Sequence, residues 1–333
     1  MKAVLMTERG GPEVLKIENI PVPAIKRGSE LLVKVKAAGM NPVDIKQRIR
    51  GTWYPSKLPQ ILGLDGAGVV EEIGPEVKRF KPGDKIYFIC GGFGKKPGAY
   101  AEYTVIEEWF AAIKPESLSF AEAAACPSSL ITSWECLFDK GRLSGGNSVL
   151  IHGGAGGVGH LTVQLAHNRG ARVATTVVNK KQADIVKKLG AEKVIIVTGN
   201  DFVKEIMEWT EGKGVDLALD LVGGETFYRT FSCVKLYGTL VALLSPVHGA
   251  GDWTEARLRN LSIILELMLT PMYFDLIETQ LHHMEILEEC AGLFDTGKLS
   301  VIVNRTFPLE DASEAHRLLE QGDIIGKIIL LME

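Results

Sequence analysis

Between residues 148 and 244 the sequence alternates between short apolar runs and amphipathic stretches, and this alternation constrains the fold most. Amphipathic helical patterns separate the runs. Parallel strands need crossover connections of a dozen or more residues, usually a helix. The region therefore predicts an α/β fold with a doubly wound parallel sheet. Five runs have the length and β-branched content of buried strands, at residues 149–151, 173–178, 194–197, 215–221 and 239–244.

The first turn of this region carries a glycine-rich loop. It has the spacing G-x-G-x-x-G at Gly154, Gly156 and Gly159, between a predicted strand and a predicted helix. In this context the first glycine permits a tight turn, the second lets the backbone approach a pyrophosphate, and the third lets the helix pack on the strand. The helix N-terminus adds N–H groups and a positive dipole end. The alternative is a purely structural turn. We expect dinucleotide binding in a Rossmann domain, through Gly154, Ala155, Gly156, Gly157, Val158 and Gly159.

The residues after the second predicted strand indicate which dinucleotide binds. A chain that binds NAD places an acidic residue about 20 positions on, where it bonds to the ribose 2′-hydroxyl. Here Asn179, Lys180 and Lys181 occupy that place. An uncharged polar residue and two cations suit a 2′-phosphate, so NADPH is predicted. The alternative is that both lysines are the solvated start of a helix, where cations are only mildly unfavourable.

The remaining sequence predicts a different kind of domain. The first 120 residues contain short strand patterns separated by Gly- and Pro-containing turns, which predicts an all-β, barrel-like half. Residues 120–138 are predicted to be helical, with Ser119 as N-cap three positions before Glu122. The apolar stretch 261–274 is predicted to be a buried or mouth-lining helix.

Length and composition limit the function classes. A chain of 333 residues suggests two domains, which we place at 1–124 with 271–333, and at 125–270. Ligands of open α/β sheets bind at the carboxyl ends of the strands, so we expect cofactor and substrate in the cleft between the domains. The net charge of −4 gives no bulk positive field for nucleic acid or an anionic membrane.

The chain carries no pattern of a membrane or secreted protein. No uncharged apolar stretch reaches the length of a membrane span, and the first residues do not resemble a signal peptide. The five cysteines are scattered and odd in number, which is typical of reduced thiols. We therefore expect a cytoplasmic protein.

Motifs along nearly the whole chain resemble the medium-chain dehydrogenase/reductase superfamily. This resemblance implies a GroES-like β-barrel catalytic domain beside the Rossmann domain. It also implies a homodimer, with the strand at 239–244 or a neighbouring edge as the candidate contact. The motifs lie at residues 2–4, 38–44, 63–70, 82–84, 152–159 and 220–224.

The pattern departs from the zinc-dependent alcohol dehydrogenases of that superfamily. They carry a cysteine where this chain has Asn41, and a His-Glu pair where it has Asp65 and Gly66. Only Cys90 lies where their four-cysteine lobe would fall. A catalytic zinc needs three protein ligands and a structural zinc needs four, and neither set can be assembled here. We expect no metal, and the pattern looks like the zinc-independent quinone oxidoreductase (zeta-crystallin-like) branch, which uses NADPH.

This resemblance implies a hydride transfer in which the cofactor does the chemistry. A site without a metal suits electron-poor acceptors, either quinones or α,β-unsaturated carbonyls. Two alternatives stay open, an enoyl-thioester reductase and a non-catalytic NADPH-binding protein. Asp44 has either a functional role or a structural one as a helix-start charge, and no general acid is assigned. The resemblance implies catalytic roles for Asn41 and Tyr54, with an amphipathic loop anchor as the alternative for Tyr54. It implies cofactor contacts for Thr132 and Ser245, and it implies that Lys327 approaches cofactor or acceptor, with a solvated strand charge as the alternative.

Overall fold

The computed structural model describes residues 1–52, 58–91, 96–198, 201–247, 249 and 251–332. Tyr54 lies outside the described residues. The chain divides into two compact units, Met1–Ser128 with Pro271–Glu333, and Ser129–Thr270. None of the helices in the described ranges is long and apolar enough to span a membrane.

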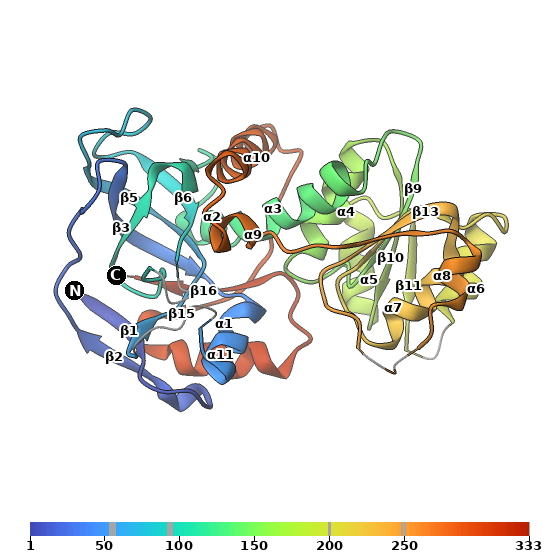
Figure 1. Cartoon of the computed structure of the whole chain (residues 1–333), viewed down its shortest axis with the longest axis horizontal. Helices are drawn as coiled ribbons and strands as arrows, with labels where there is room; N and C mark the ends of the chain where they lie inside the picture. The colour runs from blue at the N-terminus through green and yellow to red at the C-terminus, as the bar shows by residue number, and fades with distance from the viewer. Residues whose placement is uncertain (53–57, 92–95, 199–200, 248, 250, 333) are drawn as a thin grey trace. The chain divides into compact units, whose positions relative to one another are not determined.

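The unit Ser129–Thr270 is built on a six-stranded parallel sheet with the order β11-β10-β9-β12-β13-β14. Helices follow its strands along the chain (Figure 1). The order runs outward on both sides of β9, which is the doubly wound arrangement. The predicted α/β Rossmann class is therefore confirmed. The elements are β9 (Ser148–His152), α4 (Gly159–Asn168), β10 (Arg172–Val177), α5 (Lys180–Lys188), β11 (Lys193–Ile196), α6 (Phe202–Trp209), β12 (Val215–Asp220), α7 (Glu225–Thr230), β13 (Val234–Ala242), α8 (Thr254–Leu258) and β14 (Ser262–Leu265).

Apolar residues at matching register positions form the core of this sheet. Leu150 on β9 lies opposite Ala174 on β10 and Ala218 on β12, and Ala218 lies opposite Leu240 on β13. All four are fully buried. Parallel strands covered on both faces are apolar along their whole length, which explains why the sequence showed continuous runs instead of alternation.

The other unit contains a seven-stranded sheet and a three-stranded sheet. The larger has the order β15-β16-β3-β5-β6-β8, with β7 paired to β3, and the smaller has the order β2-β1-β4. Every pairing is antiparallel except that of β15 with β16. The strands are β1 (Lys2–Met6), β2 (Leu15–Asn19), β3 (Glu30–Gly39), β4 (Gln60–Ile61), β5 (Asp65–Ile73), β6 (Lys85–Ile89), β7 (Tyr103–Glu107), β8 (Ala111–Ile113), β15 (Val303–Pro308) and β16 (Lys327–Leu331).

The C-terminal end of the chain completes this larger sheet. Strand β16 pairs with β3, with Ile329 opposite Gly39, and the Met40 N–H donates to Ile328 O at 3.0 Å. Figure 1 shows this red strand lying against the blue strands of the N-terminal segment. The pairing brings Lys327, at the start of β16, next to the residues that follow β3. The helices of this unit include α1 (Pro42–Arg50), α2 (Phe120–Ala124), α10 (Ile277–Asp295) and α11 (Ala312–Gln321).

The expected helix at 120–138 is divided in the structure. It forms α2, then α3 (Pro127–Trp134), and continues as a π-helical segment over Glu135–Lys140. Proline lacks an N–H and restricts the residue before it, so Pro127 ends one helix and begins the next. The predicted N-cap is confirmed, since the Glu122 N–H donates to Ser119 Oγ at 3.2 Å and the Ser119 N–H to Glu122 Oε2 at 2.8 Å.

The prediction of a helix at 261–274 is wrong. The structure has the sixth strand β14 there, followed by the four-residue helix α9 (Thr270–Tyr273). The segment 262–265 is a short β-branched run, and a run of that length fits a strand as well as a helix. A second correction follows. The strand that covers 239–244 is not a sheet edge, because β13 lies between β12 and β14, and β14 is the edge strand.

Helix α11 buries a neutral histidine against α1. Neither ring nitrogen of His316 has a partner among the described residues, and its ring meets the edge of Tyr100 at 5.8 Å between centroids. Burial, and secondarily the Arg48 guanidinium, lowers the pKa of His316 to about 3.

Replacing His316 with Phe is expected to reduce the loss of stability in acid. The unfolded histidine takes up a proton near pH 6.5, whereas the folded one stays neutral until about pH 3. This contribution to stability is therefore complete above pH 6.5 and is lost as pH falls toward 3. At pH 5 the loss amounts to about 2 kcal/mol. Urea unfolding of wild type and His316→Phe at pH 7 and pH 5 measures it.

His282, whose side chain is 42% exposed, provides the control. His282→Phe should keep the wild-type difference between the two pH values. An equal loss between pH 7 and pH 5 in wild type and His316→Phe would show that His316 does not carry the effect.

Candidate functional site

The glycine loop starts from a fixed strand end at the point where the strand order reverses. His152, the last residue of β9, lies opposite Thr176 on β10 and Asp220 on β12. Its Nδ1 lies 3.1 Å from Thr176 Oγ1 and its Nε2 2.9 Å from Thr230 Oγ1. Burial lowers the pKa of His152 to about 3, so the ring is neutral. In doubly wound sheets this reversal point is where ligands bind.

Three of the loop glycines are required by the loop itself. Gly153 has φ 74°, a left-handed conformation that favours glycine. A Cβ on Gly154 would collide with the Thr175 side chain, and one on Gly159 would collide with the carbonyl oxygen of Gly153. The left-handed residue of the turn is therefore Gly153. Our assignment of the tight turn to Gly154 is wrong, since Gly154 permits close packing on β10.

Gly156 is different, because the protein's own packing does not require it. A Cβ there would meet only the Gly153 oxygen, at 3.4 Å. Within the described ranges, the N–H groups of Gly157 and Val158 donate to no protein acceptor, and both residues are partly exposed just before α4. Open space beside free N–H groups at a helix start fits a pyrophosphate. The residues present thus fit a dinucleotide.

The predicted specificity residues lie together at the start of α5. Asn179 is its N-cap, and its Oδ1 accepts from the Gln182 N–H at 3.0 Å. Lys180 Nζ lies 2.9 Å from Asp184 Oδ1, and Lys181 is exposed. These residues follow β10, the second strand of the sheet, as the sequence predicted.

Two further residues were predicted to contact the cofactor. Thr132 is buried on α3, and Ser245 is exposed, three residues after the end of β13. Ser245 thus follows the carboxyl end of a strand, the side of such a sheet on which ligands bind.

The other unit holds a buried group of side chains that we call the polar cluster: Asn41, Asp44, Asp65, Tyr100, Ser128 and Lys327. Each is at most 8% exposed. The six come from five stretches of the chain, and the cluster joins the start of α1, the start of β5, the start of α3 and the start of β16.

Asp65 is the common acceptor of the polar cluster. Its Oδ2 accepts from Asn41 Nδ2 at 2.9 Å, from Ser128 Oγ at 2.6 Å and from Lys327 Nζ at 3.2 Å. Its Oδ1 accepts from the Ser128 N–H at 2.8 Å. Lys327 Nζ also donates to Asn41 Oδ1 at 2.5 Å. The alternative interpretation of Lys327 as a solvated strand charge is therefore wrong.

Asp44 has the structural role that the sequence left open. Its Oδ2 accepts from the Asn41 N–H at 2.8 Å, at the start of α1, and from the Tyr100 hydroxyl at 3.1 Å. Burial raises the pKa of Asp44 to about 7, and the charge of Asp65 adds to this, while the Asn41 and Tyr100 hydrogen bonds and Lys327 oppose it.

Ser128 and Tyr100 were missed by the sequence analysis. Ser128 lies in the first turn of α3, where backbone N–H groups have no partner within the helix. Asp65 satisfies one of these donors from 63 positions away. A serine directly after a helix-starting proline is a weak local signal, and nothing near Tyr100 in the sequence marks it.

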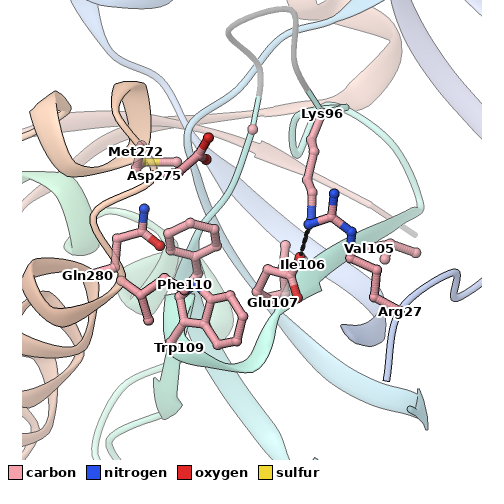
Figure 2. Close-up of a pocket in the computed structure, with 12 residues that line it drawn as sticks. Arg27, Lys96, Val105, Ile106, Glu107, Trp109, Phe110, Met272, Asp275 and Gln280 are labelled. Atoms are coloured by element: carbon pink, nitrogen blue, oxygen red, sulfur yellow. Dashed lines mark hydrogen bonds and ion pairs between the residues drawn. The ribbon is translucent and has the colours of Figure 1, made fainter. Parts of the chain in front are cut away.

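A separate cavity of about 340 Å³ lies in the same unit. One side is apolar, with Trp109, Phe110 and Met272, and the other carries Glu107, whose Oε1 accepts from Lys96 at 2.7 Å and from Arg27 at 3.1 Å. Figure 2 shows Lys96 and Arg27 converging on Glu107. None of the predicted site residues that the structure describes lines this cavity.

Comparison with known proteins identifies the family. A model described as the alcohol dehydrogenase GroES-like domain matches residues 27–116, and one described as zinc-binding dehydrogenase matches 189–330. The 2-methylene-furan-3-one reductase of Solanum lycopersicum is 35% identical over 343 residues, which cover 99% of this chain and 79% of that protein. The chain belongs to the medium-chain dehydrogenase/reductase superfamily.

Solved structures of the superfamily have a similar fold over the full length of this chain. The Escherichia coli quinone oxidoreductase complexed with NADPH has a TM-score of 0.88 and 30% identity, with both chains covered completely. A structure described as an NAD-dependent alcohol dehydrogenase has a TM-score of 0.90 and 32% identity, also with complete coverage of both chains. The resemblance to the quinone oxidoreductase branch is confirmed, and the chain is an oxidoreductase of this superfamily.

The name of the second family model refers to zinc, which the polar cluster does not fit. The oxygens of Asn41 and Asp65 already accept hydrogen bonds from the Lys327 ammonium, which is itself a cation. Cys90 is buried, and its Sγ donates to Gly63 O at 3.2 Å. Among the described residues no three His, Cys, Asp or Glu side chains are grouped as metal ligands.

Replacing Gly156 with Ala is expected to weaken dinucleotide binding while the fold stays intact. The added methyl meets only one atom within 4 Å, yet it fills the space beside the free N–H groups. We expect an unchanged Tm and a Kd for NADPH raised at least about tenfold, which is ~1.4 kcal/mol. Nucleotide fluorescence titration measures the Kd.

Gly292 on α10 is the matched control, since a Cβ there would meet nothing within 4 Å. Gly292→Ala should bind NADPH as wild type does. Wild-type affinity in Gly156→Ala would contradict binding of the pyrophosphate at this loop.

Proposed function

We propose that the chain is an NADPH-dependent reductase that transfers a hydride to a quinone or an α,β-unsaturated carbonyl without zinc. The observation that carries the proposal is the open space at Gly156 beside free N–H groups, at the reversal point of the sheet. The named activities of the Solanum lycopersicum and Escherichia coli relatives support the acceptor class.

The polar cluster supports the same acceptor class. Bound NADPH supplies the hydride. Since Asn41 and Asp65 bond to a lysine instead of offering a zinc site, the chain suits acceptors that are already electron-poor. Negative charge then develops on the acceptor oxygen, where fixed hydrogen-bond donors are most effective. We propose that Asn41 borders the acceptor, together with Tyr54.

We propose NADPH over NADH on the residues at the start of α5. The 2′-phosphate carries about −1.5 to −2 charges. Asn179 and Lys181 bring a polar group and a cation to this position, and Lys180 adds a second cation. The bond from Lys180 to the exposed Asp184 is weak in water and would give way to a phosphate. We also propose that Thr132 and Ser245 contact the nicotinamide half of the cofactor.

We further propose that the protein is a homodimer that works in the cytoplasm. Strand β14 is at the edge of its sheet in the described part of the chain, and Leu265 on it and Leu267 just after it are 58% and 46% exposed. An apolar sheet edge of this kind favours pairing with a second copy. All five cysteines are buried and free, which is typical of a reducing compartment.

Steady-state oxidation of NADPH with a panel of acceptors tests the reaction. We expect turnover with quinones and with α,β-unsaturated ketones or aldehydes, and none with saturated ketones. The panel includes an enoyl thioester to separate the related reductase activity. Turnover with saturated ketones alone, or with no acceptor, would contradict the proposed function.

Charge changes at the start of α5 test the cofactor preference. We expect wild type to prefer NADPH by about tenfold to a hundredfold in kcat/KM. Asn179→Asp should erase or invert this preference, because the new carboxylate repels the phosphate and accepts from a ribose hydroxyl. Lys180→Ala with Lys181→Ala should weaken NADPH binding and leave NADH nearly unchanged.

Lys187→Ala with Lys188→Ala is the control, since it removes the same charge from the exposed end of the same helix. This variant should keep the wild-type ratio. If wild type uses both cofactors equally, and the Lys180–Lys181 double variant has unchanged kcat/KM with NADPH and with NADH, the lysines are only a solvated helix start.

A further inference from the structure

We propose that Lys327 is the catalytic cation of this reductase, whose free N–H bond binds the acceptor oxygen while Asn41 and Asp65 hold the ammonium in place. This inference rests on the proposed reductase function. In the step itself the hydride adds to an acceptor carbon, and the displaced π electrons move to the carbonyl oxygen. Lys327 stabilises the resulting enolate or hydroquinone monoanion, which then takes a proton from water.

The burial of Lys327 calls for an explanation. Its side chain is 4% exposed, on a strand that pairs with neighbours on both sides. Lysine is almost never fully buried unless it is paired, because removing an ammonium from water is costly. Its ion pair with Asp65, at 3.2 Å, lowers that cost.

Asp65, however, has hydrogen-bond donors other than Lys327. Its carboxylate also accepts from Asn41 Nδ2 and from both the hydroxyl and the backbone N–H of Ser128. Neutral donors thus already satisfy much of this carboxylate. A lysine that served only to neutralise Asp65 would have no reason to bond to Asn41 as well.

A count of donors leaves one N–H of Lys327 free. An ammonium has three N–H donors and no acceptor. Two point to Asn41 Oδ1 and Asp65 Oδ2, and the third meets no acceptor among the residues that the structure describes. A buried cation with one unused donor direction is the arrangement that an oxyanion requires.

The position of the ammonium is fixed on several sides. The Asn41 amide has one consistent orientation, because its oxygen faces a donor and its nitrogen faces a carboxylate. The backbone of Asn41 is held by Asp44, and Met40 bonds to Ile328, the residue after Lys327. A preorganised charge of this kind needs no reorganisation when the oxyanion forms.

Two variants that share one substitution isolate the ammonium. Lys327→Met alone would leave Asp65 buried without its counter-charge, so Asp65→Asn is compared with the double variant Lys327→Met with Asp65→Asn. We expect kcat of the double variant to fall about 10²–10³-fold below that of Asp65→Asn. The Kd for NADPH should stay within about threefold of wild type, because the lost contact is to the acceptor. Equal kcat in the two variants would overturn the inference.

Lys114→Met is the matched control for removal of a buried lysine. Lys114 is 8% exposed in the same unit, and within the described part of the chain its ammonium donates to the carbonyl oxygens of Pro115 and Leu118. This variant should lower Tm and keep the wild-type kcat. A kcat loss as large as that of the double variant would show that any buried lysine has this effect.

A binding measurement separates Lys327 from the reductase reaction. 4-Nitrophenol absorbs visible light as the phenolate, so its ionisation can be followed on the protein with NADP⁺ present. We expect wild type and Asp65→Asn to bind the phenolate and lower the pH at which the probe ionises. The double variant should not.

The outcomes distinguish the two proposals. Phenolate binding that depends on Lys327, without turnover of any acceptor, would contradict the reductase and leave the anion-binding lysine supported. Two results would leave the reductase proposal supported and overturn the role of Lys327. All variants would turn over the acceptor and bind the phenolate equally, or all would turn over the acceptor while wild type bound no phenolate.

Discussion

The carboxylate of Asp65 is the group on which the unit formed by both chain ends depends. It is fully buried and, counted over the residues that the structure describes, accepts four hydrogen bonds from three residues, at the starts of α1, α3 and β16. A buried carboxylate costs free energy unless each oxygen accepts hydrogen bonds. Loss of any one donor would therefore destabilise the arrangement of the other donors around Asp65. The residues that β16 and α3 contribute are therefore fixed by the same charge that fixes Asn41.

The nucleotide-binding sheet depends on a constraint of another kind, the close approach of backbone to backbone. Gly154 and Gly159 have no room for a side chain, and Gly153 has a left-handed backbone. These three shape the loop, while Gly156 leaves its outer side open. The neutral His152 holds the strand end that precedes them, between two threonine hydroxyls. The packing of the protein thus requires three of the loop glycines and places no such demand on Gly156.

The sequence predicted what local patterns determine. The strand–helix alternation, the glycine loop and the cap at Ser119 each depend on residues within a few positions of one another, and all are present. The strand β14 was missed because a run of only four residues does not distinguish a strand from a helix. The bonds from Ser128 to Asp65 and from Lys327 to Asn41 join residues 63 and 286 positions apart. No local pattern encodes such a pair, so the burial of Lys327 could be seen only in the structure.

The polar cluster also shows how a protein can hold a cation without a metal ion. A divalent ion brings two charges and requires deprotonated ligands, so its binding depends on pH and on supply. The Lys327 ammonium brings one charge, which Asp65 balances, and it is attached covalently to β16. The second carboxyl, Asp44, has its pKa raised to about 7 by burial, so it takes up a proton more readily than an exposed carboxyl does. The neutral amide of Asn41 is enough to bind the Lys327 ammonium, whereas a metal ion would need a deprotonated ligand at that place. Because the ammonium belongs to the chain, folding alone puts this cation in place.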